Sequence, residues 1–264
     1  MANVNYNLDT YLAQIARGEI EGASLFSSYG SSDLSGAVSK QLVFPNGAYT
    51  FHYPDQTTGD AITFVSDSAQ DGVGGTGIRS LHVHYLDVDL NPVDKVITLN
   101  GLTAVTGQLT GCRFIQCMHI DTYGTGKAAA GNIIAYLAGA ATPVDNVVSI
   151  IKLGDTRCSS SMRMVPAGKK WFIFGAAASS VSATADTSSI VDIFATQIEG
   201  HNYFEDFVRV PIASLGLQNT AVPYKFPTPL PFTEGAVVGA QFTTNKAATC
   251  TVSLFGWLEN KGAN

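Results

Sequence analysis

Short segments in which apolar and polar residues alternate recur along almost the whole chain from residue 61 onward. AITFVSDS (61–68) and SLHVHYLDVD (80–89) alternate apolar and polar residues, with Leu81, Val83 and Tyr85 on one face of the second segment when it is extended. Further segments of this kind cover 95–101, 112–120, 131–139, 149–154, 161–177, 190–200, 203–212, 237–244 and 248–260. Gly, Asn, Pro and Ser lie between them, as expected at strand ends. This pattern predicts a mainly β protein built of β-sandwich or jelly-roll domains.

The length of 264 residues allows one large β domain or two domains of about 100 residues each. The stretch ATPVDNVV (141–148) lies between two groups of predicted strands and is a candidate boundary. We therefore predict an N-terminal helix and extended arm over 1–54, a first β-sandwich domain over 55–148 and a second over 149–264. A single large sandwich is the alternative.

One segment near the N-terminus, NLDTYLAQIAR (7–17), departs from the β pattern. Its apolar residues share one face at helical spacing: Leu8, Tyr11, Leu12 and Ile15. Gly18 is a plausible end of this helix. A helix this short needs a surface to pack on, either its own domain or a neighbouring molecule. The Ser/Gly-rich residues 22–53 that follow are predicted to form a connecting arm with one or two strands.

Charge patterning excludes several classes of partner. Charged residues make up 14% of the chain, against about 25% in an ordinary soluble domain, which favours a surface that faces other protein. The net charge is −6, and no basic cluster is longer than Lys169–Lys170, so no nucleic-acid partner is expected. The N-terminus lacks the pattern of a secretory signal, and no apolar stretch approaches about eighteen residues. We therefore expect neither secretion nor a membrane partner.

The four cysteines form no CxxC pair: Cys112, Cys117, Cys158 and Cys250. Cys112 and Cys117 are five positions apart and would point to opposite faces of a single strand. We interpret all four as small packing residues and expect no disulfide or zinc framework. This agrees with synthesis in a reducing cytosol.

The stretch most suggestive of chemistry is GGTGIRSLHVHYLDVDLNPVDKVITLNG (74–101). His82 and His84 are two positions apart and share a strand face, which is a ligand geometry for zinc or iron. His119 is the nearest further histidine, but no carboxylate is placed by spacing to complete a site. The preferred interpretation is a β-hairpin, with DLNPVD as its polar turn and KVITLNG as its return strand. No metal and no cofactor is predicted.

Two other binding motifs, a calcium loop and a phosphate-binding loop, lack residues that they require at fixed positions. A calcium loop would use Asp87, Asp89, Asn91 and Asp94. The Gly and Glu that an EF-hand needs are replaced by Pro92 and Thr98. The run GVGGTG (72–77) is followed by a predicted strand, whereas a phosphate-binding loop needs GK[ST] and a helix.

Catalytic patterns are also missing from the sequence. It contains no GxSxG or HExxH motif. The carboxylates of its later part are scattered, with no pair spaced for glycoside hydrolysis: Asp186, Asp192, Glu199, Glu205 and Asp206. We therefore predict no catalytic residue and no enzyme activity.

Four segments resemble virion proteins of tailed bacteriophages, especially of marine phages: residues 65–105, 112–133, 165–176 and 15–30. The order GTGxR, LD and TLNG within the first segment is the most distinctive part. Together the segments are spread over most of the chain. The resemblance implies a non-enzymatic, mainly β structural component of the virion, assembled in the bacterial cytoplasm. It brings no functional residues with it.

Within that resemblance, the expected role is a capsid-decorating or head-fibre protein. The chain has no heptad run and no shaft-like repeat, which favours a compact body attached through its N-terminal arm. The expected partners are further copies of itself, with a homotrimer suggested by analogy, and the major capsid protein or other virion proteins.

The alternative role is a tail or neck adaptor, or a fibre component that binds a host-surface glycan. Its candidate sugar platform is aromatic: Tyr203, Phe204, Phe207 and Trp257. Aromatic residues of β-sandwiches more often belong to the core.

Overall fold

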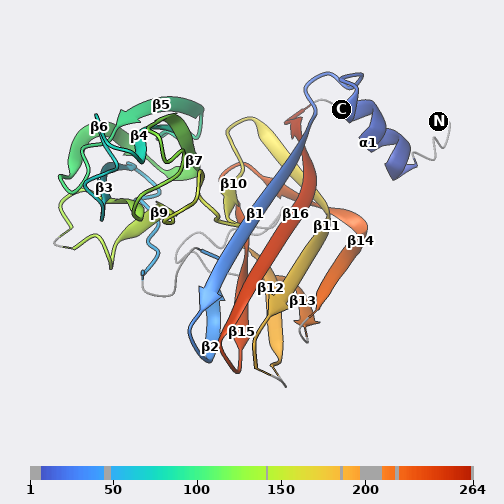
Figure 1. Ribbon diagram of the computed structural model, residues 1–264. Helices are drawn as coiled ribbons and strands as arrows, with labels where there is room; N and C mark the ends of the chain where they lie inside the picture. Colours follow the sequence, from blue (N-terminus) through green and yellow to red (C-terminus); the bar gives the residue numbers. More distant parts are fainter. Residues whose placement is uncertain are drawn as a thin grey trace.

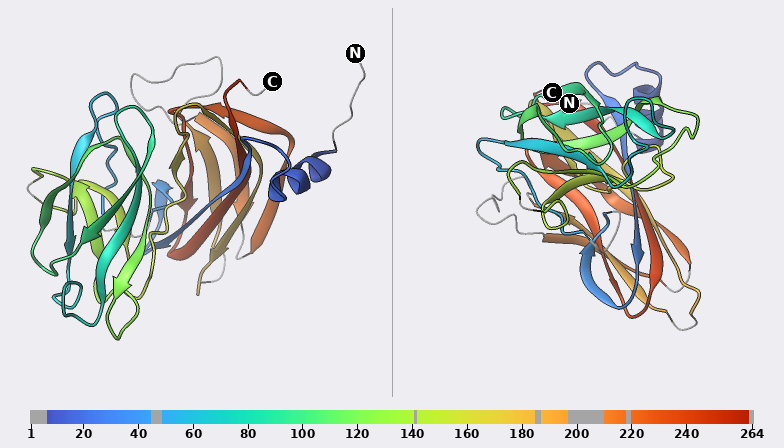
Figure 2. Two further views of the ribbon diagram at one scale, coloured as in Figure 1. Left: turned by 90° about the horizontal axis from the view of Figure 1, so that it is seen from above. Right: turned by 60° about the vertical axis from the view of Figure 1, so that its left-hand side comes forward.

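The computed structural model describes residues 7–44, 49–140, 142–184, 187–196, 210–217 and 220–262. Its strands form four antiparallel sheets that pack in pairs as two β-sandwiches, which confirms the predicted fold class. Figures 1 and 2 show the two sandwiches side by side. Among the described residues, no helix is long and apolar enough to cross a membrane.

The first sandwich is formed by the middle of the chain. One of its sheets has the order β6 (Val105–Cys112), β3 (Asp60–Ser66), β8 (Ile133–Leu137) and β9 (Val147–Ile151). The facing sheet has the order β5 (Pro92–Thr98), β4 (Ile78–Leu86) and β7 (Phe114–Tyr123). Their apolar faces meet in a core that includes Phe64, Leu81 and Met118, all fully buried.

The second sandwich combines both ends of the chain. One sheet has the order β1 (Ser24–Leu34), β16 (Ala248–Asn260), β11 (Lys169–Val181) and β14 (Ala221–Thr233). The other has the order β10 (Arg163–Met164), β15 (Val237–Thr244), β12 (Ser189–Ala195) and β13 (Val210–Leu217), with β2 (Val38–Leu42) also paired to β15. Trp171, Ile193 and Phe242 lie in the core between them.

The predicted division of the chain needs two corrections. The segment expected to be an arm supplies β1, which pairs with β16 over its whole length, and β2, so it is part of the second sandwich. The inward positions in the middle of β1 are small, with Ser28, Gly30 and Ser32 all buried, so apolar residues face inward only near its ends, at Phe26 and Leu34. The predicted boundary after residue 148 falls inside β9, which pairs with β8 of the first sandwich.

Helix α1 (Leu8–Ala16) has the predicted extent and packs on its own chain. Asn7 caps its first turn, and Gly18 follows it at a positive φ of 73°. The Tyr11 hydroxyl donates to Glu259, and the Tyr11 ring packs edge-on against Trp257 with centroids 5.7 Å apart. The helix therefore docks beside the sheet that contains β16 and does not extend as a free arm.

Two further strand predictions differ from the structure. The segment 161–177 is divided into β10 and β11, because Pro166 and Gly168, which has a φ of +66°, form a turn between them. Residues 221–233, which are not among the predicted strands, form β14. β14 contains four prolines and lies at a sheet edge, where a strand tolerates missing N–H donors. Most of the predicted strand 203–212 lies outside the described residues.

A third apolar cluster joins the two sandwiches. It contains Phe114 and Leu86 from the first sandwich and Met164, Phe194 and Val237 from the second. The side chain of Gln116 on β7 also bridges to the backbone of Met164, with Nε2 donating to its carbonyl at 2.5 Å and Oε1 accepting from its N–H at 3.3 Å. The junction is therefore a packed, hydrogen-bonded interface, and not a flexible linker alone.

Candidate functional site

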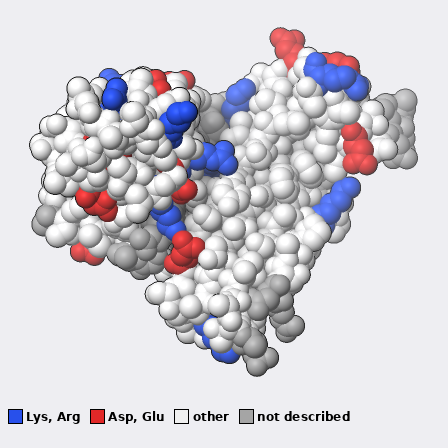
Figure 3. Space-filling model, in the orientation of Figure 1, with Lys and Arg blue, Asp and Glu red and all other residues white. Residues whose placement is uncertain are grey.

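The outer face of the sheet formed by β1, β16, β11 and β14 is nearly uncharged. Figure 3 shows this face almost free of charged side chains in the part of the chain that is described. The alternation of burial along the strands turns mainly uncharged side chains outward: Leu25, Ser27, Tyr29, Phe172, Phe174, Ala177, Ser179, Thr251, Ser253 and Phe255. The charged residues Asp33 and Lys225 also face outward, but they lie near the end of β1 and on the edge strand β14. Leu25 is 51% exposed and Tyr29 40%. We call this surface the uncharged sheet face.

Two grooves lie on the uncharged sheet face, with aromatic side chains between them. A groove of about 400 Å³ runs between helix α1 and the sheet and is lined by apolar residues such as Leu8, Leu12 and Pro223, with the ion pair of Asp9 and Lys225 also in its lining. A second, of about 220 Å³, is lined by Leu25 and its neighbours. Phe174 and Phe255 line both. A contiguous apolar surface with few charges is typical of a protein–protein contact.

The second candidate site is a cluster of three histidines on the outer face of the first sandwich. His82 and His84 alternate along β4 with Leu81 and Val83, which point into the core. β7 pairs with β4 and places His119 directly opposite His82. On the other side of β4, β5 places Asp94 opposite His84. The sheet thus brings together the three histidines that spacing alone could only suggest.

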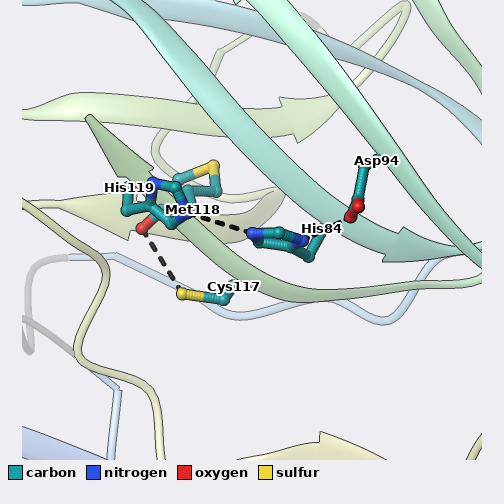
Figure 4. Close-up of polar contacts among 5 residues, drawn as sticks. All are labelled: His84, Asp94, Cys117, Met118 and His119. Atoms are coloured by element: carbon teal, nitrogen blue, oxygen red, sulfur yellow. Dashed lines mark hydrogen bonds and ion pairs between the residues drawn. The ribbon is translucent and has the colours of Figure 1, made fainter. Parts of the chain in front are cut away.

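The ring nitrogens of these histidines converge. One nitrogen from each of His82, His84 and His119 lies within 4.8 Å of the other two. His84 Nε2 lies 3.0 Å from His119 Nε2. Figure 4 shows these two rings facing each other, with Asp94 on the far side of His84. His84 Nδ1 contacts the Asp94 carboxylate, and His119 Nδ1 lies 3.1 Å from the backbone carbonyl of Ile120.

The environment favours a neutral ring at His119. Burial lowers the pKa of His119, and the neighbouring His84 and His82 lower it further. A neutral imidazole is the form that binds metal ions. Three imidazoles on one sheet are a donor set that suits zinc and similar transition metals.

The hairpin predicted for the region around these histidines is confirmed, because β4 pairs with β5. The return strand begins at Pro92, earlier than expected. The Asp87 carboxylate accepts from the backbone N–H groups of Asp89 at 2.9 Å and Asn91 at 2.8 Å, so it stabilises the turn. This use of Asp87 explains the acidic turn without a calcium ion.

The glycine-rich run 72–77 surrounds a buried carboxylate. Asp71 is fully buried and accepts hydrogen bonds from the Ser66 hydroxyl and from the backbone N–H groups of Ile78, Ala130 and Gly131, at 2.7–3.0 Å. A side chain on Gly77 would lie 2.1 Å from Asp71 Oδ1, so the glycine permits this approach. The run therefore has a structural role.

The other residues singled out in the sequence do not form a site in the described part of the chain. Trp257 is 5% exposed and stacks on Phe172, with ring centroids 5.0 Å apart, so it belongs to the sheet packing. Asp192 accepts hydrogen bonds from Ser214 and Gln241. Seven of those residues lie outside the described residues: Asp186, Glu199, Tyr203, Phe204, Glu205, Asp206 and Phe207.

The cysteines are free thiols. Cys112 lies on β6 and Cys117 on β7, so the two do not share a strand as assumed above. Burial raises the pKa of Cys112. Cys158 Sγ lies 3.8 Å from Cys117 Sγ without a bond between them. Cys112, Cys158 and Cys250 are buried, in agreement with a packing role.

Comparison with known proteins gives no family. No family model and no curated protein matches this chain significantly. Similar solved structures include the VP2 subviral particle of infectious bursal disease virus, at 10% identity over 92% of this chain and 73% of that chain, with a TM-score of 0.23. Another is the Gx strain of the same virus, at 13% identity over 92% of this chain and 78% of that chain, with a TM-score of 0.22. TM-scores this low do not establish a shared fold.

Proposed function

We propose that this chain is a non-enzymatic structural protein of a bacteriophage virion that decorates the capsid surface through protein–protein contacts. The observation that carries the proposal is the uncharged sheet face, which exposes Leu25, Tyr29 and Phe255. The resemblance of residues 65–105, 112–133 and 165–176 to phage virion proteins supplies the biological setting.

The arrangement of the two sandwiches supports attachment through the second one. The uncharged sheet face belongs to the second sandwich, whereas the first sandwich lies to one side of it (Figure 1). Helix α1 docks beside the same face and lines one of its grooves. We therefore place the contact with the major capsid protein on this face, in place of the free N-terminal arm expected from the sequence. The first sandwich then lies beside this contact.

A charge at the centre of the uncharged sheet face is expected to prevent incorporation into virions. Ser253 lies on β16 between Tyr29 of β1 and Ala177 of β11. Ser253→Arg should lower the amount of this protein on purified virions at least ten-fold, because a desolvated, unpaired guanidinium opposes docking. Immunoblotting of virions purified by density gradient measures the change.

The matched control is Thr98→Arg, at an exposed position of β5 in the first sandwich. It introduces the same charge on a strand and should leave incorporation unchanged. Both variants should retain the thermal unfolding midpoint of the parent, measured by circular dichroism. Equal incorporation of folded Ser253→Arg and parent protein would show that the uncharged sheet face is not the attachment surface.

A further inference from the structure

The hydrogen bonds around His84 and His119 leave two lone pairs facing each other. Asp94 and the carbonyl of Ile120 can only accept, so each must receive the Nδ1–H of its histidine. In the neutral rings, Nε2 of both histidines is then unprotonated. These two nitrogens lie 3.0 Å apart. Two acceptors at hydrogen-bond distance need a cation between them, which can be a proton or a metal ion.

A small adjustment of the rings would also admit a metal ion. Two nitrogens bound to one tetrahedral Zn²⁺ are separated by about 3.3 Å, given a Zn–N distance of about 2.0–2.1 Å. The third histidine is also in reach, since its ligand nitrogen lies within 4.8 Å of the other two. The ring centroid of His82 lies 4.5 Å from that of His84 and 5.2 Å from that of His119. A rotation of the half-buried His82 side chain would complete a three-nitrogen set, whereas a shared proton needs only two rings.

The hydrogen-bond partners of the other ring nitrogens, Nδ1 of His84 and of His119, are also those found at metal sites. Histidines that bind metals usually donate their other ring N–H to a carboxylate or to a backbone carbonyl, which fixes the tautomer and the ring orientation. Asp94 does this for His84, and the carbonyl of Ile120 does it for His119. Both rings therefore present Nε2 to the same point before any ion binds.

We propose that His82, His84 and His119 bind one Zn²⁺ ion, with a water molecule in the remaining position and with Asp94 as a positioning residue for His84. The ion would tie β4 to β7 near the junction of the two sandwiches, since His84 lies two residues from Leu86 of the junction cluster. This site goes beyond the virion role and is independent of it, because it is complete within one chain.

Zinc binding by the purified full chain, without a polyhistidine tag, tests the proposal. After treatment with a chelator and dialysis, the protein should bind one Zn²⁺ per chain, measured by competition with a chromophoric chelator and by metal analysis after desalting. His84→Ala and His119→Ala should each weaken the affinity at least 100-fold. Asp94→Asn should weaken it about 10- to 100-fold, as expected for a second-layer partner.

His52→Ala is the matched control, because His52 is exposed and is not part of the cluster. It should leave affinity and stoichiometry unchanged. Zinc binding by the parent chain tests the proposal even if a variant fails to fold. Bound Co²⁺ should give visible d–d absorption bands that Zn²⁺ removes, and Zn²⁺ should raise the thermal unfolding midpoint. A parent chain that retains no Zn²⁺ and gives no Co²⁺ bands would overturn the proposal and leave a shared proton as the occupant.

Discussion

Replacing Asp71 with alanine is expected to lower the free energy of unfolding by about 4 kcal/mol or more. The side chain accepts four hydrogen bonds from three segments of the first sandwich, and three of the four lie in buried surroundings. Each buried donor left without an acceptor costs about 1–3 kcal/mol, and the substitution also leaves a cavity. Urea denaturation followed by far-UV circular dichroism measures the loss.

Asp71→Asn separates hydrogen bonding from packing in this experiment. The amide keeps the size of the carboxylate but turns one acceptor into a donor facing other donors, so we expect a loss only moderately smaller than that of alanine. Asp89→Ala, in the exposed turn after β4, should change stability by no more than about 0.5 kcal/mol. Near-parent stability of Asp71→Asn and Asp71→Ala would contradict the role given to this carboxylate.

Replacing Phe114 with alanine is expected to lower the free energy of unfolding by about 3–5 kcal/mol and to uncouple the two sandwiches. Phe114 is 3% exposed and belongs to the apolar cluster between them. Both tryptophans, Trp171 and Trp257, lie in the second sandwich, so their fluorescence reports on that body alone. Fluorescence and circular dichroism should therefore give separate unfolding midpoints in the variant.

The matched control for Phe114 is Tyr123→Ala at the other end of the same strand. Tyr123 is 50% exposed, so its truncation should cost far less. In the parent protein, the two probes should report a single transition, because the junction is packed and hydrogen-bonded. Coincident midpoints in Phe114→Ala would show that the cluster does not couple the sandwiches.

The fold class was predictable because most strands carry an apolar face at period two. β1 and β2 were predicted only as strands of a connecting arm, because two of the buried positions of β1 are Ser28 and Ser32 and because β2 has only five residues. β14 was missed because its prolines are permitted only by its place at a sheet edge, which depends on the topology. Local sequence cannot supply information of that kind.

Only part of the histidine cluster could be predicted from the sequence. Spacing alone places His82 and His84 on one face. The approach of His119 depends on the register between β4 and β7, and that of Asp94 on the register between β4 and β5. The preference for a simple hairpin was right about the backbone, but it gave no sign that the outward side chains converge. The role of Asp71 was hidden for the same reason, because its partners at residues 130 and 131 are distant in sequence.

Immunogold labelling of intact virions tests the central claim most directly. The antibody should be raised against the first sandwich, because attachment through the uncharged sheet face would leave that body exposed. The proposal predicts gold distributed over the heads. Gold confined to the neck or tail would contradict capsid decoration and support the adaptor or fibre role. Particles that carry no gold, from a lysate in which the protein is detected, would contradict a place on the virion surface.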